Sequence, residues 1–329
     1  MNVFVTGGAG YVGSHCVRTL CDAGHDVVVF DNLSTGHRGA VDPRADLIVG
    51  DLSERAPLAD LLSERSIEAV MHFAASAEVG ESVRKPLFYY RNNVANTLNL
   101  LEAMRETGVR HLVFSSTCAT YGVPPSVPIT ETMPQQPINP YGRTKLAIEW
   151  LLRDSAAAWS LGATALRYFN AAGAASDGSI GEDHDPESHL IPRVLQVALG
   201  KRDDLRIFGV DYPTPDGTCV RDYIHVEDLA TVHRLVLESS TEGAFRFYNV
   251  GTGMGASVKE VIEAARAVTG HKIPAAPAPR RPGDPPQLYA DPTKVRTELN
   301  WEPKYTDIRR IIETAWNWHR AHPDGFADA

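Results

Sequence analysis

Short apolar segments alternate with longer amphipathic segments through the first half of the 329-residue chain. The apolar segments are rich in β-branched residues, which predicts buried parallel strands at residues 3–5, 26–30, 47–49, 69–73 and 112–114. Helix-like stretches at 11–23 and 96–107 lie between them, and each is followed by a glycine, Gly24 or Gly108. This alternation predicts an α/β fold with a doubly wound parallel sheet, which binds ligands at the carboxyl ends of its strands.

The alternation ends near Ala171, and a more irregular pattern follows. Residues 171–189 are rich in Gly, Asp and Ser, and residues 274–286 are rich in Pro and Arg, so we expect two loops. A smaller C-terminal α/β lobe is therefore expected beside the sheet. The expected first domain covers 1–170 plus about 220–252, and the lobe covers about 171–219 plus 253–329.

Composition narrows the class of protein. The formal net charge of −9 argues against a general binder of nucleic acid or acidic membranes. The four cysteines show no metal-binding spacing and are expected to be free thiols in a reducing cytosol. Because a strand is predicted from Val3, we expect no signal peptide. No apolar run in the sequence reaches the roughly 20 residues that span a bilayer. We expect a cytoplasmic protein without a bound metal, because the acidic loop 183–185 fits no standard ion site.

A glycine-rich turn connects the first strand to the first helix. Gly7, Gly10 and Gly13 form the motif GxxGxxG, and Gly8 adds an overlapping GxGxxG. Glycine permits a tight turn and close approach of the backbone to pyrophosphate, whose charge the N–H groups at the helix start stabilise. In this strand–turn–helix context the motif predicts a Rossmann sheet that binds a dinucleotide.

Acidic residues follow the next two strands. Asp31 ends the second strand, where a carboxylate accepts both hydroxyls of the adenosine ribose and repels a 2′-phosphate, which predicts NAD rather than NADP. Asp51 and Leu52 follow the third strand. They either face the adenine ring or belong to a helix cap near Ser53.

A second pattern predicts proton transfer. Tyr141 and Lys145 lie one helical turn apart in a segment that opens a helix running toward Trp159, so both side chains share a face. Bringing a tyrosine pKa from about 10 to about 7 requires about 4 kcal/mol of preferential stabilisation of the phenolate. A nearby ammonium and a positive nicotinamide ring both act in that direction, which predicts Tyr141 as a general base. Thr117, at the carboxyl end of the fifth strand, is expected to hydrogen-bond the hydroxyl being oxidised.

Longer motifs resemble the UDP-glucose 4-epimerases, a family of extended short-chain dehydrogenases/reductases. The resemblance covers essentially the whole chain, and its last two segments are the most specific to that activity. The segments are TGGAGYVGSH (6–15), DNLSTG (31–36), FAASAEVGESVRKP (73–86), FSSTCATYG (114–122), NPYGRTK (139–145), LRYFNAAG (166–173), IFGVDYPTPDGTCVRDYIHVEDLA (207–230) and RRPGDPPQLYADPTK (280–294).

This resemblance implies an isomerase of galactose and nucleotide-sugar metabolism that interconverts UDP-galactose and UDP-glucose. Tyr141 removes the proton of the sugar 4-hydroxyl while a hydride passes from C4 to tightly bound NAD. The 4-keto sugar then turns over, and the hydride returns to its opposite face. The resemblance further implies a homodimer formed through helices at about 92–107 and 143–158, an NAD-binding first domain and a UDP-sugar-binding lobe.

The same resemblance assigns binding residues. Cofactor contacts are expected from Gly7, Gly10, Tyr11, Val12, Gly13, Asp31, Asn32, Asp51, Leu52, Phe73, Ala74, Asn93, Ser115, Tyr141, Lys145 and Tyr168. Substrate contacts are expected from Thr117, Tyr141, Asn170, His189, Leu190, Phe208, Arg221, Arg281, Asp284 and Leu288. The two arginines are expected to bind the diphosphate, because a guanidinium matches phosphate geometry. Asp284 is expected to bind the uridine ribose, and Phe208 is expected to contact the uracil. Leu288 is expected at a gate position beside the sugar C2 substituent.

Some positions depart from the family pattern. Ala77 stands where some members have a lysine near the pyrophosphate, and His189 where some have an asparagine. Cys118 and Ala119 follow Thr117, where 4,6-dehydratases carry Asp-Glu, which argues against water elimination. Two other functions stay open: 4-epimerisation of a different UDP-sugar (N-acetylglucosamine, pentose or uronate), and a non-catalytic NAD-binding regulator.

Overall fold

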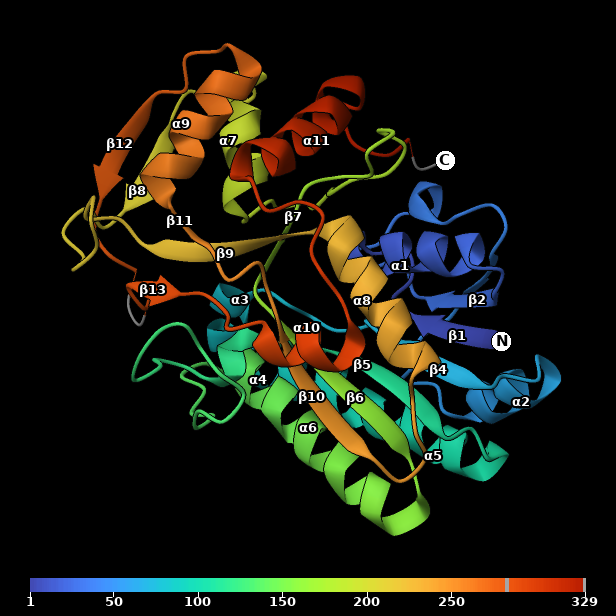
Figure 1. Cartoon of the computed structure of the whole chain (residues 1–329). Coiled ribbons are helices and arrows are strands. Elements are labelled where there is room, and N and C mark those ends of the chain that lie inside the picture. Colours follow the sequence, from blue (N-terminus) through green and yellow to red (C-terminus); the bar gives the residue numbers. More distant parts are fainter. Residues whose placement is uncertain (282–283, 328–329) are drawn as a thin grey trace. The chain divides into compact units, whose positions relative to one another are not determined.

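The computed structural model of the chain describes residues 1–281 and 284–327. It separates into two compact units (Figure 1). Unit 1 comprises Met1–Val123, Pro134–Tyr168 and Ala230–Tyr248, and unit 2 comprises Pro124–Met133, Phe169–Leu229 and Asn249–Ala329. The expected first domain contained 124–133, 169–170, 220–229 and 249–252, but these residues lie in unit 2. For 220–225 the reason is that strand β9 (Val220–His225) pairs with the strands of that unit.

A seven-stranded sheet forms the centre of unit 1, in the order β10-β6-β5-β4-β1-β2-β3. Strands β1 to β6 pair in parallel in the order expected of a Rossmann sheet, which confirms the predicted fold class. The strands are β1 (Asn2–Thr6), β2 (Asp26–Asp31), β3 (Asp46–Val49), β4 (Ala69–His72), β5 (His111–Thr117), β6 (Gly162–Tyr168) and β10 (Phe245–Val250).

Helices cover both faces of this sheet (Figure 1). They are α1 (Tyr11–Asp22), α2 (Ala56–Glu64), α3 (Val79–Arg84), α4 (Pro86–Tyr89), a π-helical turn η2 (Tyr90–Ala95), α5 (Asn96–Thr107), α6 (Pro140–Trp159) and α8 (Val226–Glu238), with 3-10 turns η1 (Arg38–Ala40) and η3 (Cys118–Thr120). Phe4 and Phe114 pack in one core with residues of α2, α5 and α6. Val29 faces the opposite way, toward Val17 of α1. The central strands of the sheet are thus buried on both faces, as their continuously apolar sequences require. The edge strand β3 is only partly buried.

Two local predictions differ from the structure. No helix is capped near Ser53: helix α2 begins at Ala56, and the Asp51 carboxylate instead accepts the backbone N–H of Ser53 at 2.8 Å in a turn. The expected loop 274–286 contains a strand, β12 (Ala275–Ala278), which pairs with β8 (Leu205–Phe208). This sheet has only two strands, so each is an edge, where proline is tolerated.

Unit 2 is a smaller α/β assembly. Strand β9 pairs with β7 (Asn170–Ala172), β11 (Gly255–Ser257) and β13 (Gln287–Leu288). Helices α7 (Leu190–Ala198), α9 (Val258–Thr269) and α11 (Ile308–Ala321) share an apolar core, and α10 (Thr293–Leu299) follows β13. A capping box between Ser257 and Glu260 begins α9.

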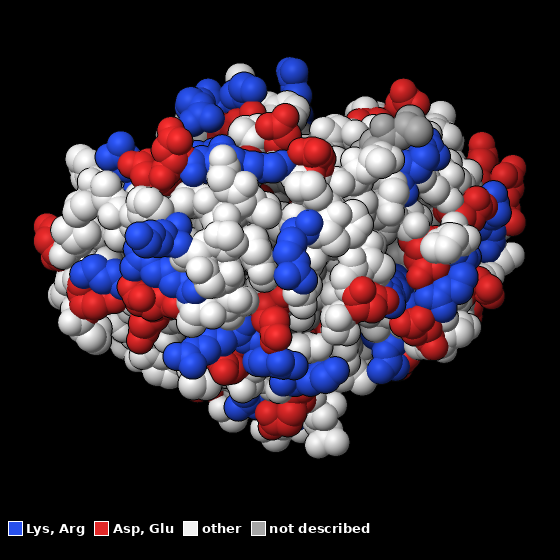
Figure 2. All heavy atoms as spheres, turned by 90° about the horizontal axis from the view of Figure 1, so that it is seen from above, with Lys and Arg blue, Asp and Glu red and all other residues white. Residues whose placement is uncertain are grey.

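Charges of both signs are interspersed on the face shown in Figure 2, without one large basic area there. Across the described residues, no helix is long and apolar enough to cross a membrane. The four cysteines are free thiols.

Candidate functional site

The glycine turn of unit 1 depends on the absence of side chains at two positions. Gly7 has φ +73°, and a Cβ there would lie 2.5 Å from the backbone nitrogen of Ala74. A Cβ on Gly13 would lie 2.1 Å from the carbonyl oxygen of Gly7. Gly10 is the N-cap of α1 and, as a glycine, provides no side-chain cap for the first N–H groups of the helix. Tyr11 and Val12 open this helix, and the geometry fits an anionic pyrophosphate.

Asp31 supports this turn directly. Its carboxylate accepts the backbone N–H groups of Ala9 at 3.0 Å and Leu33 at 2.9 Å. Each carboxylate oxygen keeps a further lone pair, which suits ribose hydroxyls. Asn32 donates to the carboxylate of Asp51 at 2.7 Å, so these two predicted cofactor residues hold each other.

The other predicted cofactor residues lie at or beyond the ends of strands β3 to β6. Leu52 is buried in the core, and Phe73 and Ala74 follow β4, where Gly7 contacts their backbone. Asn93 is fully buried in the π-helical turn. Its side chain accepts the backbone N–H of Ser76 at 2.9 Å and donates to Thr144 at 3.1 Å. In the described structure Asn93 therefore braces α6 against the segment after β4.

The predicted catalytic residues come together within unit 1. Asn139 caps α6 by accepting the N–H of Gly142, which starts the helix that carries Tyr141 and Lys145. The Nζ atom of Lys145 donates to the carbonyl oxygen of Ser115 at 2.8 Å and lies 6.0 Å from the centre of the Tyr141 ring. Thr117 hydrogen-bonds Tyr141. The structure thus places the proposed base, the amino group of a lysine and a hydroxyl within one group.

Burial sets the electrostatics of this group. It raises the pKa of Tyr141, and the hydrogen bond to Thr117 acts in the opposite direction. It also lowers the pKa of Lys145 to about 7. The hydroxyl of Tyr168 lies 2.7 Å from that of Ser115, and burial raises the pKa of Tyr168 to about 12. Burial therefore opposes formation of a phenolate at Tyr141, and a positive charge beside its ring would act in the opposite direction.

A buried ion pair beside the catalytic group was not predicted from the sequence. Arg167 of β6 donates to both carboxylate oxygens of Glu149 on α6, and both side chains are almost completely buried. Ser116, directly before Thr117, donates to the same carboxylate at 2.6 Å. The available signal was an arginine directly after the apolar run 161–166.

Unit 2 brings together several of the predicted substrate residues. Arg221 of β9 forms an ion pair with Asp284, although we expected one to bind phosphate and the other ribose. Leu288 of β13 lies opposite Arg221 in the register of these strands and is half-buried, so it does not lie in the apolar core. Asn170 of β7 pairs with Tyr223, two positions further along β9.

The remaining predicted residues lie on other elements of unit 2. The guanidinium of Arg281 stacks on the ring of Phe208 at 4.2 Å from its centre. His189 is the N-cap of α7, and Leu190 is the first residue of that helix. The imidazole of His189 contacts Glu182 and Glu187.

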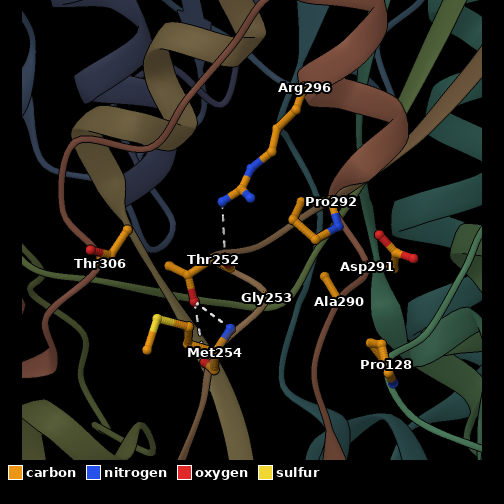
Figure 3. A pocket seen from close by; sticks show the side chains of 9 residues that line it. All are labelled: Pro128, Thr252, Gly253, Met254, Ala290, Asp291, Pro292, Arg296 and Thr306. Atoms are coloured by element: carbon orange, nitrogen blue, oxygen red, sulfur yellow. Dashed lines mark hydrogen bonds between the residues drawn. The ribbon is translucent and has the colours of Figure 1, made fainter.

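A pocket of unit 2 contains none of the predicted site residues (Figure 3). Thr252, Gly253 and Ala290 are part of its lining. All three donate backbone N–H groups to the fully buried carboxylate of Asp222, at 2.9 to 3.1 Å. The prominent aspartate of the VRDYIH segment thus holds three chain segments together in unit 2.

Comparison with known proteins identifies the family. Residues 3–251 match the NAD dependent epimerase/dehydratase family. The UDP-glucose 4-epimerase of Lacticaseibacillus casei is 54% identical over 329 residues, which cover 100% of this chain and 99% of that protein. The crystal structure of UDP-glucose 4-epimerase from Brucella ovis in complex with NAD matches with a TM-score of 0.92 and 50% identity, covering 96% of this chain and 97% of that one.

A third match is the crystal structure of UDP-glucose 4-epimerase from Bifidobacterium longum in complex with NAD+ and UDP. Its TM-score is 0.94 at 41% identity, and the match covers 99% of this chain and 100% of that one. These matches confirm the resemblance inferred from the motifs. The chain therefore belongs to the NAD dependent epimerase/dehydratase family.

Proposed function

We propose that the protein is an isomerase that inverts C4 of a UDP-hexose, interconverting UDP-galactose and UDP-glucose through a transient 4-keto sugar. One observation carries the proposal: Tyr141 hydrogen-bonds Thr117 beside the buried amino group of Lys145, in a chain that is 54% identical to a UDP-glucose 4-epimerase. The cofactor is NAD. No net oxidation of the sugar results.

Proton transfer belongs to the side chains of unit 1. The phenolate of Tyr141 accepts the proton of the 4-hydroxyl, and the Thr117 hydroxyl orients that group. When bound, NAD would supply hydride transfer from and back to C4 and a positive ring charge that favours the phenolate. Lys145 is held by Ser115, so its amino group stays close to Tyr141. Tyr141 then returns the proton to O4 of the inverted sugar.

The cofactor residues divide into backbone and side-chain contacts. The turn around Gly7, Gly10 and Gly13 suits the pyrophosphate because a Cβ at two of these positions would meet backbone atoms. Asp31 suits the adenosine ribose because its carboxylate ends β2 and keeps lone pairs available. Asn93 acts indirectly in this proposal, since its amide already binds Ser76 and Thr144.

The UDP contacts are assigned to unit 2. Arg221 and Arg281 would bind the diphosphate, because a guanidinium binds phosphate oxygens in a bidentate manner. Asp284 then exchanges its ion pair with Arg221 for the hydroxyls of the uridine ribose. Phe208 would contact the uracil. The sugar and the remaining polar groups of the UDP-sugar would be contacted by Asn170, His189 and Leu190. Leu288 would limit the substituent at C2.

We also propose a homodimer in the cytoplasm. Leu98 on α5 and Trp150 on α6 are large exposed apolar side chains on the two helices expected to form the interface. Free thiols suit a reducing compartment. Size-exclusion chromatography with light scattering tests the dimer, and a Trp150→Glu variant should shift it toward the monomer.

Tyr141→Phe tests the catalytic assignment. We expect kcat for UDP-galactose, followed by a coupled readout of UDP-glucose, to fall about 10²–10⁴-fold while NAD stays bound, because one hydroxyl is lost and little packing changes. Tyr90→Phe is the matched control, since it deletes a hydroxyl from an exposed ring. A Tyr141→Phe enzyme that keeps more than about half of kcat would contradict the role.

A panel of UDP-sugars separates the remaining functions. Turnover of UDP-galactose above that of UDP-N-acetylglucosamine, pentose and uronate forms supports the proposed substrate. NAD binding without turnover of any UDP-sugar would instead identify a non-catalytic NAD-binding regulator.

A further inference from the structure

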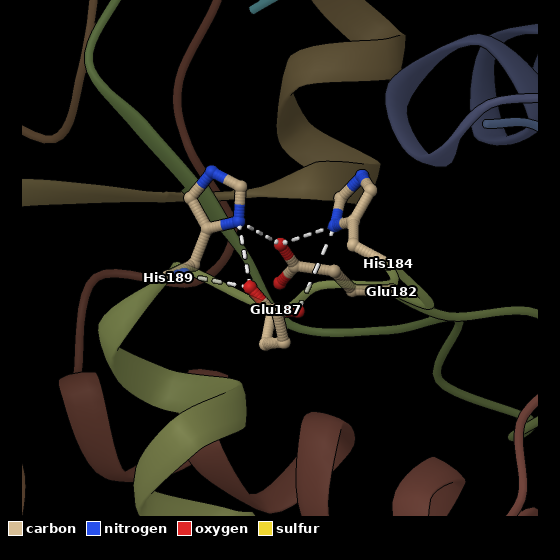
Figure 4. A group of neighbouring side chains, drawn as sticks. All are labelled: Glu182, His184, Glu187 and His189. Carbon is tan, nitrogen blue, oxygen red and sulfur yellow. Dashed lines mark hydrogen bonds and ion pairs between the residues drawn. The ribbon is translucent and has the colours of Figure 1, made fainter. Parts of the chain in front are cut away.

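Four potential metal ligands meet in the loop that precedes α7. Glu182, His184, Glu187 and His189 each place one ligand atom within 4.8 Å of the others. Figure 4 shows the Nδ1 atoms of both imidazoles and the carboxylates of both glutamates pointing toward a common centre. All four residues belong to unit 2 and come from one short stretch of chain.

The distances within this group fit one small ion. Nδ1 of His184 lies 3.3 Å from Glu182 Oε1 and 3.6 Å from Glu187 Oε2. Nδ1 of His189 lies 2.9 Å from Glu182 Oε1 and 3.0 Å from Glu187 Oε1. A tetrahedral ion with bonds of about 2.0–2.1 Å separates its ligands by about 3.3 Å. These four separations bracket that value, with a different Glu187 oxygen facing each histidine, and one ligand atom from each residue lies within 4.8 Å of the others. Rotation of these side chains would therefore complete such a site.

The carboxylate of Glu182 provides a second, independent observation. Its residue is only 4% exposed, and among the described residues its Oε1 atom accepts no hydrogen bond. Nevertheless, the Nδ1 atoms of His184 and His189 lie 3.3 and 2.9 Å from this oxygen. The atoms are close enough but lack the direction of an N–H···O bond. A shared cation satisfies a buried oxygen in this position.

The loop is also held in place around these ligands. Asp183, between the first two, accepts the backbone N–H of Phe326 at 3.0 Å. Glu187 accepts the backbone N–H of His189 at 2.6 Å, and His189 in turn begins α7. These contacts preorganise the ligands, which lowers the ordering cost of binding an ion.

We propose that Glu182, His184, Glu187 and His189 bind one Zn²⁺ ion. Two imidazole nitrogens and two carboxylate oxygens suit this borderline metal, whereas Ca²⁺ and Mg²⁺ require oxygen ligands in greater number. The two glutamates balance the charge of the ion. The proposal departs from our expectation of no metal, which considered the acidic residues 183–185 and not the glutamates on either side of them.

The site has a consequence for His189. Coordination through Nδ1 leaves the proton on Nε2, so the outer edge of the ring becomes a fixed hydrogen-bond donor. The His189 side chain is 52% exposed and can reach a ligand. A role of this donor toward a sugar diphosphate rests on the proposed function, but the metal site itself does not.

Metal binding by the full chain without a histidine tag tests the site. The protein is treated with a chelator, desalted and titrated with Zn²⁺ by calorimetry, and retained metal is measured by elemental analysis. We expect one Zn²⁺ per chain and a higher Tm with the ion. Glu182→Gln should weaken binding at least about tenfold. His271→Gln, which alters an exposed histidine outside the group, should leave it unchanged.

Several outcomes would overturn the proposal. The wild-type protein could bind no Zn²⁺. That result is expected if ion pairs between protonated histidines and the glutamates are all that hold the group together. It could also bind Zn²⁺ no more tightly than Glu182→Gln, or His271→Gln could lose as much affinity. If Glu182→Gln does not fold, the Zn²⁺ affinity of His184→Gln is compared with that of wild type instead. The number of Zn²⁺ ions bound per wild-type chain tests the proposal without any variant. None of these measurements uses turnover, so a failure of the proposed function would leave them interpretable.

Discussion

At Gly7 of the cofactor turn, alanine should have two separate effects. One is the strain of a positive φ, and the other is the contact of its Cβ with the backbone of Ala74. Gly7 and Gly24 both have positive φ, +73° and +80°. A Cβ on Gly24 would meet nothing within 4 Å, whereas a Cβ on Gly7 would lie 2.5 Å from the nitrogen and 2.8 Å from the Cα of Ala74. Gly24→Ala is therefore a matched control that carries the strain without the clash.

The magnitudes follow from these contacts. A left-handed conformation costs a non-glycine residue about 1–2 kcal/mol, which both variants share. Ordinary contacts lie at about 3.5–4.0 Å, so Gly7→Ala must move backbone by about 1 Å. Overpacking of this kind adds about 1–3 kcal/mol. Because the moved backbone is the expected pyrophosphate site, loss of one charge-assisted hydrogen bond, about 1.5–3 kcal/mol, would weaken NAD binding about 10–100-fold.

The assay measures NAD affinity by calorimetry and Tm without added NAD for both variants. We expect both to melt earlier than wild type, Gly7→Ala the more so, and only Gly7→Ala to lose NAD affinity. Two results would refute the reasoning: Gly7→Ala binds NAD within about threefold of wild type, or Gly24→Ala loses as much affinity as Gly7→Ala. Either result would mean that NAD binding does not depend on close approach of the backbone at Gly7 to the pyrophosphate.

Three further predictions concern cofactor choice, substrate range and stability. Asp31→Ala should lower the ratio of NAD to NADP affinity, and the ratio is the readout because Asp31 also supports the turn backbone; an unchanged ratio would place the ribose contact elsewhere. Leu288→Cys should raise, and Leu288→Tyr lower, kcat/KM for UDP-N-acetylgalactosamine relative to UDP-galactose, since steric misfit is worth about 1–3 kcal/mol; a constant ratio across the three proteins would refute the gate. Glu149→Gln should destabilise the protein by about 3–5 kcal/mol in urea unfolding, because Arg167 is left buried without its counter-charge. Glu242→Gln, which breaks an exposed ion pair, should cost about 0–1 kcal/mol, and equal effects of the two changes would be inconsistent with this reasoning.

The cofactor turn and the catalytic helix could be predicted because their chemistry is local. The glycines from Gly7 to Gly13 act within one turn, and Tyr141 and Lys145 share a helix face through their spacing alone. Strands β1, β2, β4 and β5 could be predicted for a related reason, since a strand buried on both faces is continuously apolar. Asp51 shows the limit of local patterns, because a turn and a helix cap place the same residue type in the same position.

Contacts between distant segments were decided only by the tertiary structure. Arg167 meets Glu149 because β6 and α6 pack together, and Arg221 meets Asp284 across 63 positions of sequence. Asp222 binds residues 30 and 68 positions away for the same reason. Composition gives the number of charges but not which of them are buried, because burial depends on strand order and on where each connection returns.

The sequence by itself determined the doubly wound sheet, the dinucleotide turn and the tyrosine–lysine pair, because each depends on residues that are neighbours along the chain. The tertiary structure alone decided which charged groups compensate one another. The group around Glu182 illustrates the difference: its four residues lie within eight positions of one another, yet only the folded loop directs their ligand atoms toward one centre. Spacing outside a helix or strand does not specify side-chain direction, so the chain has to fold before such a site can be recognised.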